Sequence, residues 1–174
     1  MIEFLYTEIN IIGIIILLLL LNNFNKNRRK NTPIDQKIFN TIMIVILLVF
    51  LFDTGMWLFN DKPTLRILNI IVTTGYYLLN PVICFVWLLY TDYKIFESKA
   101  ELSKRFAFYI LPIIVCTIMS LCSPFTEWFF VISKENHYIR GPYFYVMAIT
   151  SIGYLLVTLV IPIVDLRRCK WKEG

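Results

Sequence analysis

The run of sequence that decides the fold covers residues 38–60 and reads IFNTIMIVILLVFLFDTGMWLFN. Its side chains are nearly all apolar, and Asp53 is the one ionisable residue among them. A helix needs about 20 predominantly apolar residues to cross a hydrocarbon core of about 30 Å. The run therefore predicts a transmembrane helix that carries an acidic side chain within the membrane.

Working outward from this run, four further apolar stretches predict four more transmembrane helices. Hydrophobic residues make up 58% of the chain and charged residues 17%, against about 45–50% and about 25% in a soluble domain. We expect an all-α fold, a single membrane domain over residues 1–174. The first stretch has neither the basic start nor the cleavage site of a signal peptide, which predicts a retained helix. The five predicted helices cover about residues 5–22, 38–60, 68–90, 106–124 and 143–164.

The lysines and arginines predict the orientation of this bundle, because cytoplasmic loops of membrane proteins carry an excess of them. If the five helices alternate in direction, thirteen basic residues fall on one side and four on the other. We therefore expect the N-terminus outside the cell and the C-terminus in the cytoplasm. The thirteen are Lys26, Arg28, Arg29, Lys30, Lys37, Lys94, Lys99, Lys104, Arg105, Arg167, Arg168, Lys170 and Lys172, and the four are Lys62, Arg66, Lys134 and Arg140.

The longest predicted segment outside the membrane lies between the fourth and fifth helices. It reads SPFTEWFFVI, then SKEN, then HYIRGP, over residues 123–142. Two short runs rich in aromatic and β-branched residues that flank a polar turn are typical of a β-hairpin. We therefore expect a short extracytoplasmic hairpin that caps the bundle.

Asp53 is the first candidate for a functional residue. An acidic side chain at the centre of a membrane helix costs about 2.5–3.5 kcal/mol on insertion scales, so it has to face the bundle, find a partner or be protonated. At the same depth, every other predicted helix offers a small or hydrogen-bonding residue. These are Asn10, Gly13, Thr74, Gly75, Tyr76, Cys116, Thr117, Thr150 and Ser151.

Two interpretations of this polar level remain open. It lines a cavity that receives a small ligand from outside, or its side chains hold the helices together by close packing and hydrogen bonds. Trp57 lies one turn from Asp53, and Asn80 precedes Pro81, which frees backbone carbonyls inside the membrane. Under the first interpretation the hairpin forms the lid. The predicted ligand-binding residues are Asp53, Trp57, Tyr77, Asn80, Thr150, Trp128 and Arg140.

Other classes of function find no support in the sequence. A Gly-rich phosphate loop, a HExxH or GxSxG motif and an acidic pair at catalytic spacing are all missing, so we expect no enzymatic activity from this chain. The four cysteines lie in or beside apolar segments and form no CxxC pair, which predicts neither a metal site nor any other cofactor. The basic residues cluster between the apolar runs, which indicates a membrane surface and not a nucleic acid.

The sequence resembles the multi-helix membrane-sensor region that precedes the diguanylate cyclase domain in proteins of Clostridia. The resemblance rests on YTEIN at residues 6–10, DYKIF at 92–96, Leu111-Pro112, and on SPFTEWFF and YIRGP at 123–130 and 138–142. It implies a sensor in the bacterial plasma membrane that passes a signal to a cytoplasmic domain making cyclic di-GMP. That catalytic domain, and the further helices usual in the family, are absent from this sequence, which predicts a truncated or isolated sensor module or a stand-alone relative.

The function expected from the sequence is therefore a non-enzymatic signal-sensing module. A small transporter or substrate-binding subunit, with Asp53 coupled to protons, is a second hypothesis, although no inverted repeat is visible. A structural partner of another membrane protein is a third. The expected partners are the lipid bilayer, a small ligand from outside, and a cytoplasmic output domain or protein, with a second copy of the chain as a further candidate.

Overall fold

The computed structural model describes the backbone of residues 2–26 and 33–172, and over these residues the fold is all-α with one small hairpin. The all-α prediction is confirmed, and the two-stranded hairpin lies where it was expected. The strands pair antiparallel, with Val131 opposite Ile139. In chain order the elements are α1 (Ile2–Lys26), α2 (Ile34–Phe59), the 3₁₀ turn η1 (Pro63–Leu65), α3 (Arg66–Phe96), α4 (Lys99–Thr126), β1 (Phe130–Ile132), β2 (Tyr138–Arg140) and α5 (Phe144–Lys172).

Four of the described helices are long and apolar enough to cross a membrane: α2, α3 with η1, α4, and the part of α5 up to Asp165. In α1 the described apolar part, Glu8–Phe24, is shorter than these four. By length and composition, the chain therefore has the helices of a multi-pass membrane protein.

The helices extend beyond the apolar runs that predicted them, most clearly around residues 90–106. The third helix was expected to end near residue 90 and the fourth to begin near 106, but α3 continues to Phe96 and α4 begins at Lys99. Only Glu97 and Ser98 separate them. The backbone of Glu97 adopts the left-handed conformation, with φ 49°. The Ser98 hydroxyl caps α4 by accepting a hydrogen bond from the Glu101 N–H at 3.4 Å. The prediction was wrong here because hydropathy marks the hydrocarbon region, whereas polar residues continue the helix outside it.

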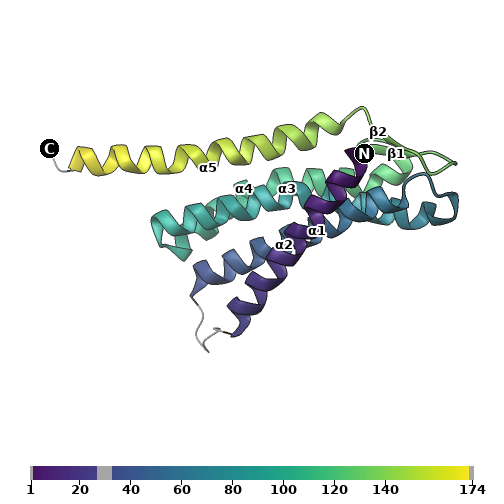
Figure 1. Cartoon of the computed structure of the whole chain (residues 1–174). Coiled ribbons are helices and arrows are strands. Elements are labelled where there is room, and N and C mark those ends of the chain that lie inside the picture. Colours follow the sequence, from purple (N-terminus) through teal and green to yellow (C-terminus); the bar gives the residue numbers. More distant parts are fainter. Residues whose placement is uncertain (1, 27–32, 173–174) are drawn as a thin grey trace.

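The central helix of the bundle is α3, which packs against α2, α4 and α5, while α1 packs against α2. Figure 1 shows that α1 begins at the end of the bundle that carries the hairpin and that α5 runs to the opposite end. We call these two ends of the molecule the hairpin end and the basic end. The basic end carries Lys26, Lys37, Lys94, Lys99 and Lys104 at or near the helix termini that meet there.

The buried face of α3 differs in part from the face that the sequence predicts. The polar and aromatic residues at three- and four-residue spacing predict one stripe through Thr73, Tyr77, Asn80, Cys84 and Trp87. Thr73 and Tyr77 are buried, but Asn80 and Cys84 are only half-buried and Trp87 is 40% exposed. The buried positions recur at three- or four-residue steps along one face of the helix. They include Asn69, Thr73, Tyr77, Pro81, Phe85, Leu88 and Asp92.

The hairpin is attached to the α2–α3 connection through Asn136, whose side chain is completely buried. Its amide nitrogen donates to the carbonyl oxygens of Phe59 at 2.6 Å and Lys62 at 2.8 Å, and its amide oxygen accepts from Asn69 at 2.8 Å. The Arg66 guanidinium also donates to two carbonyl oxygens of the hairpin. These contacts place the hairpin over the space between α2 and α5.

Candidate functional site

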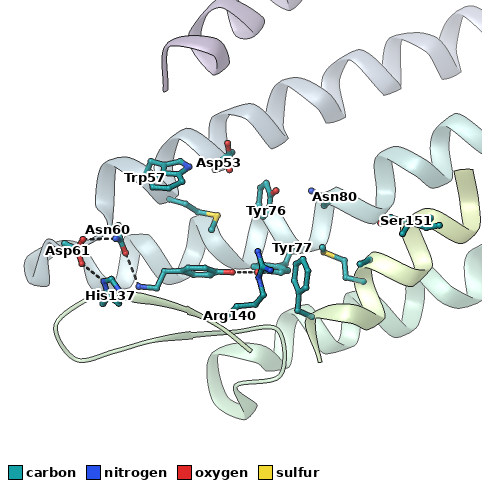
Figure 2. Close-up of a pocket in the computed structure, with 16 residues that line it drawn as sticks. Asp53, Trp57, Asn60, Asp61, Tyr76, Tyr77, Asn80, His137, Arg140 and Ser151 are labelled. Atoms are coloured by element: carbon teal, nitrogen blue, oxygen red, sulfur yellow. Dashed lines mark hydrogen bonds and ion pairs between the residues drawn. The ribbon is translucent and has the colours of Figure 1, made fainter. Parts of the chain in front are cut away.

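A cavity of about 740 Å³ lies beneath the hairpin, between α2, α3 and α5 (Figure 2). Its walls combine aromatic rings and methionines with a small number of polar and charged groups. This combination is typical of sites for small molecules, whose volumes are about 300–1,000 Å³. The lining residues are Asp53, Met56, Trp57, Asn60, Asp61, Tyr76, Tyr77, Asn80, His137, Tyr138, Arg140, Phe144, Met147, Ala148, Ser151 and Ile152.

Asp53 has one hydrogen-bond partner in the described part of the chain, and it comes from α1. The side-chain amide of Asn10 donates to Asp53 Oδ2 at 2.6 Å. Asn10 is itself buried, with 7% of its surface exposed. No lysine, arginine or histidine among the described residues pairs with Asp53. The carboxylate therefore faces the cavity with an amide as its partner and no cation.

An aromatic cluster forms the wall between the cavity and the hairpin. The Tyr77 ring is fully buried and stacks on Phe129 and Phe130, with ring centroids 5.8 and 5.4 Å apart. Its hydroxyl makes a hydrogen bond with the hydroxyl of Tyr138 on β2. Tyr76 packs edge-on against Tyr77. The helix and the hairpin thus share one apolar core at this wall, which fixes the hairpin over the cavity.

The mouth of the cavity carries the other charged groups. His137 Nδ1 lies 2.8 Å from a carboxylate oxygen of Asp61, and both side chains are more than half exposed. The Asn60 side chain accepts from the backbone N–H of Tyr138 at 3.0 Å. The Arg140 guanidinium lies over the Phe144 ring, 4.2 Å from its centroid. Polar contacts therefore link the α2–α3 connection to the hairpin at this mouth.

Of the seven residues predicted to bind a ligand, five line the cavity: Asp53, Trp57, Tyr77, Asn80 and Arg140. The other two lie outside it. Thr150 accepts a hydrogen bond from the Cys116 thiol at 3.5 Å, between α4 and α5. Trp128 packs edge-on against Tyr143 near the base of the hairpin. These two positions match the alternative interpretation, in which side chains hold elements together, and ligand binding by the other five stays a prediction.

Several lining residues were missed from the sequence. Tyr76 belongs to the predicted polar level but is not among the predicted ligand-binding residues, and neither are Asp61 and His137. Nothing in their sequence context distinguishes them, since their place at the mouth depends on the hairpin folding back over α2. The only signal was the aromatic content of the hairpin, which indicated a cap.

A second polar cluster lies at the basic end and was also missed. The Asp92 carboxylate is completely buried, and it accepts from two nitrogens of Arg105, at 2.7 and 2.8 Å, and from the Tyr109 hydroxyl at 2.9 Å. The Arg105 guanidinium also lies 4.4 Å from the centre of the Phe96 ring. This cluster joins α3 to α4 and leaves no room for a ligand at the carboxylate.

Within the described residues, no group of three or more histidine, cysteine, aspartate or glutamate side chains could hold a metal ion. The fold is thus a helical bundle in which four of the described helices are long and apolar enough to cross a membrane, and it encloses a cavity with the volume of a small-molecule site. Comparison with protein-family models, with curated proteins and with solved structures finds no match to this chain. The function is therefore argued from the site alone.

Proposed function

We propose that this chain is a membrane signal-sensing module that binds a small molecule in the cavity beneath the hairpin and relays the event to the cytoplasm. In this proposal all five helices cross the membrane, the hairpin end lies outside and the basic end inside. The excess of lysine and arginine at the basic end supports this orientation. The membrane is the bacterial plasma membrane, as the resemblance to cyclase sensor regions implies.

The observation that carries the proposal is the cavity itself. It has the volume of a small-molecule site, it is lined by aromatic rings, and it contains an intramembrane carboxylate with no cationic partner among the described residues. Ionisable residues within membrane helices mark functional sites by default, because their burial is costly. Packing of helices alone would not require such a space next to Asp53.

The route for the signal is α5. Phe144, Met147 and Ser151 on this helix line the cavity, and the same helix continues to Lys172 at the basic end (Figure 1). It packs mainly against α3 and has few contacts with α4. A ligand that contacts α2, α3 and α5 together favours one arrangement of α5 over another, which shifts the population of a two-state equilibrium. The cytoplasmic partner is a separate output domain or protein, and the chain itself is not an enzyme.

The test is a fusion of the whole chain to a diguanylate cyclase domain placed after Gly174. Cyclic di-GMP is measured in bacterial cells that express the fusion, relative to the amount of fusion protein in the membrane. We expect Asp53→Asn and Trp57→Ala to change this output by about fivefold or more, the lower limit of the usual coupling between two sites.

The matched control is Ile149→Ala, which shortens an α5 side chain that is 64% exposed and does not line the cavity. Its output should equal that of the unmodified fusion. If both cavity variants reach the membrane in normal amounts and also leave the output unchanged, the cavity has no part in signalling and the proposal fails.

A further inference from the structure

The charges in the cavity are unevenly paired, and this asymmetry identifies the chemistry of a ligand. Of the four ionisable groups of histidine, aspartate or arginine that line it, Asp61 and His137 contact each other at 2.8 Å. Asp53 and Arg140 remain. Among the described residues, Asp53 Oδ2 accepts from the Asn10 amide and Arg140 lies over the Phe144 ring, but neither has a partner of opposite charge.

These two groups lie within reach of the same small molecule. Asp53 and Arg140 both line the cavity beneath the hairpin, together with Tyr76. Figure 2 shows Asp53 and Arg140 on opposite sides of Tyr76, with the cavity between α2 and the hairpin. A negative pole from α2 and a positive pole from β2 therefore face one shared space.

Aromatic rings line the space between the two poles. They belong to Trp57, Tyr76, Tyr77 and Phe144. The face of an aromatic ring attracts ammonium groups, most strongly where water is excluded. A guanidinium binds carboxylate groups through two parallel hydrogen bonds. The two poles and the rings thus select opposite charges at the two ends of a ligand, with an apolar body between them.

We propose that the cavity binds a small organic zwitterion, with its ammonium group toward Asp53, its acid group toward Arg140, and an aromatic or aliphatic body against the tyrosines. The inference rests on the proposed function, since it names the ligand of the same cavity. A volume of about 740 Å³ accommodates an amino acid with a large side chain or a short peptide. Binding gives Asp53 the cationic partner that the described protein residues do not provide.

The experiment compares ligands that share one body and differ in charge. The zwitterions are L-phenylalanine, L-tryptophan and phenylalanyl-phenylalanine; phenethylamine carries only the positive charge, hydrocinnamate only the negative, and hydrocinnamyl alcohol neither. Binding to the purified full chain in lipid nanodiscs is measured by calorimetry and by the shift of the thermal unfolding midpoint. We expect at least one zwitterion to bind about tenfold or more tightly than each analogue with a single charge, because each lost pole removes a charge-assisted hydrogen bond.

Charge variants then assign each pole. Asp53→Asn should lower the affinity for the zwitterion and for phenethylamine by about tenfold and leave the affinity for hydrocinnamate unchanged. Arg140→Gln should lower the affinity for the zwitterion and for hydrocinnamate and leave the affinity for phenethylamine unchanged. Lys134→Gln is the matched control, because Lys134 is an exposed basic residue of the same hairpin that does not line the cavity. It should change none of the affinities.

Three results would overturn the inference. The first is that no zwitterion of the set binds; the second is that the analogues with one charge or none bind as tightly as the zwitterion. The third is that both charge variants weaken all ligands alike. The cyclase fusion separates this failure from that of the proposed function: if Asp53→Asn changes the cyclase output while no zwitterion binds, sensing stands and the ligand class is wrong.

Discussion

Asp53 and Asp92 are the same residue type on neighbouring helices, and the structure places them in opposite situations. Asp92 is completely buried and is held by two nitrogens of Arg105 and by the Tyr109 hydroxyl. Asp53 is partly buried beside a cavity, with the Asn10 amide as its one hydrogen-bond partner in the described chain. One end of the bundle thus closes completely around a carboxylate, and the other leaves a carboxylate facing open space.

The difference follows from how the helices are connected. Because only Glu97 and Ser98 separate α3 from α4, the two helices form a tight antiparallel pair that places Arg105 opposite Asp92. At the hairpin end, α2 and α5 are far apart in sequence, and each packs mainly against α3. The space between them is covered by the hairpin. The basic end is therefore closely packed around its carboxylate, whereas the hairpin end contains a cavity beside its carboxylate.

The largest expected effect is the loss of the ion pair at the basic end. Arg105→Leu leaves the Asp92 carboxylate buried without its charged partner, and the free energy of unfolding should fall by about 3–5 kcal/mol. Unfolding of the purified chain in mixed detergent micelles measures this change. A fall of less than about 1 kcal/mol, the value typical of an exposed ion pair, would show that the ion pair of Asp92 with Arg105 is not a buried one.

Asp92→Asn should lower the free energy of unfolding by less than Arg105→Leu does. The Arg105 side chain is 31% exposed and keeps Glu101 at 3.3 Å, so it can turn toward water when its main partner is lost. We expect a fall of about 1–3 kcal/mol in the same unfolding measurement, mainly from the lost charge-assisted hydrogen bonds. Equal effects of the two substitutions would contradict the asymmetry in burial.

The sequence predicts more of the structure at the hairpin end than at the basic end. The apolar runs predicted the five helices, and the aromatic runs around residues 133–136 predicted the hairpin. The depth count also placed Asn10 near Asp53, where the two side chains meet. Such features are local, because a membrane fixes helix length and depth before any tertiary contact forms.

The basic-end cluster could not be predicted in the same way. Hydropathy ended the third helix near residue 90, which put Asp92 in a solvated loop, where an acidic residue needs no partner. In the structure α3 continues past Asp92 to Phe96, and the cap at Ser98 begins α4 at Lys99. This short connection brings Arg105 opposite Asp92. Asn136 posed the same difficulty, since a polar residue in a turn looks alike whether it is solvated or buried under a hairpin.

An intermediate effect is expected at Asn136, because the hairpin end is closely packed around this side chain although it also contains the cavity. Asn136→Ala removes three hydrogen bonds from a completely buried position and leaves the carbonyl oxygens of Phe59 and Lys62 without this donor. The free energy of unfolding should fall by about 1–3 kcal/mol. Glu135→Ala, at the exposed neighbouring position of the same turn, should leave stability within about 0.5 kcal/mol. A similar loss in both variants would mean that the turn, and not the buried amide, determines stability.

The smallest effect on stability is expected at Asp53, and the sign of the change in the free energy of unfolding distinguishes Asp53 from Asp92. Asp53→Asn keeps an oxygen that can accept from Asn10, and it removes a charge whose place in a membrane helix costs about 2.5–3.5 kcal/mol at the centre. The free energy of unfolding should therefore stay unchanged or rise by up to about 1 kcal/mol, because an amide is also unfavourable there. Thr54→Val is the control on the same turn, since the Thr54 hydroxyl has no hydrogen-bond partner within the described residues. A fall of more than about 2 kcal/mol for Asp53→Asn would show that Asp53 is a paired structural charge like Asp92. In that case the cavity would owe its carboxylate to packing and not to a ligand.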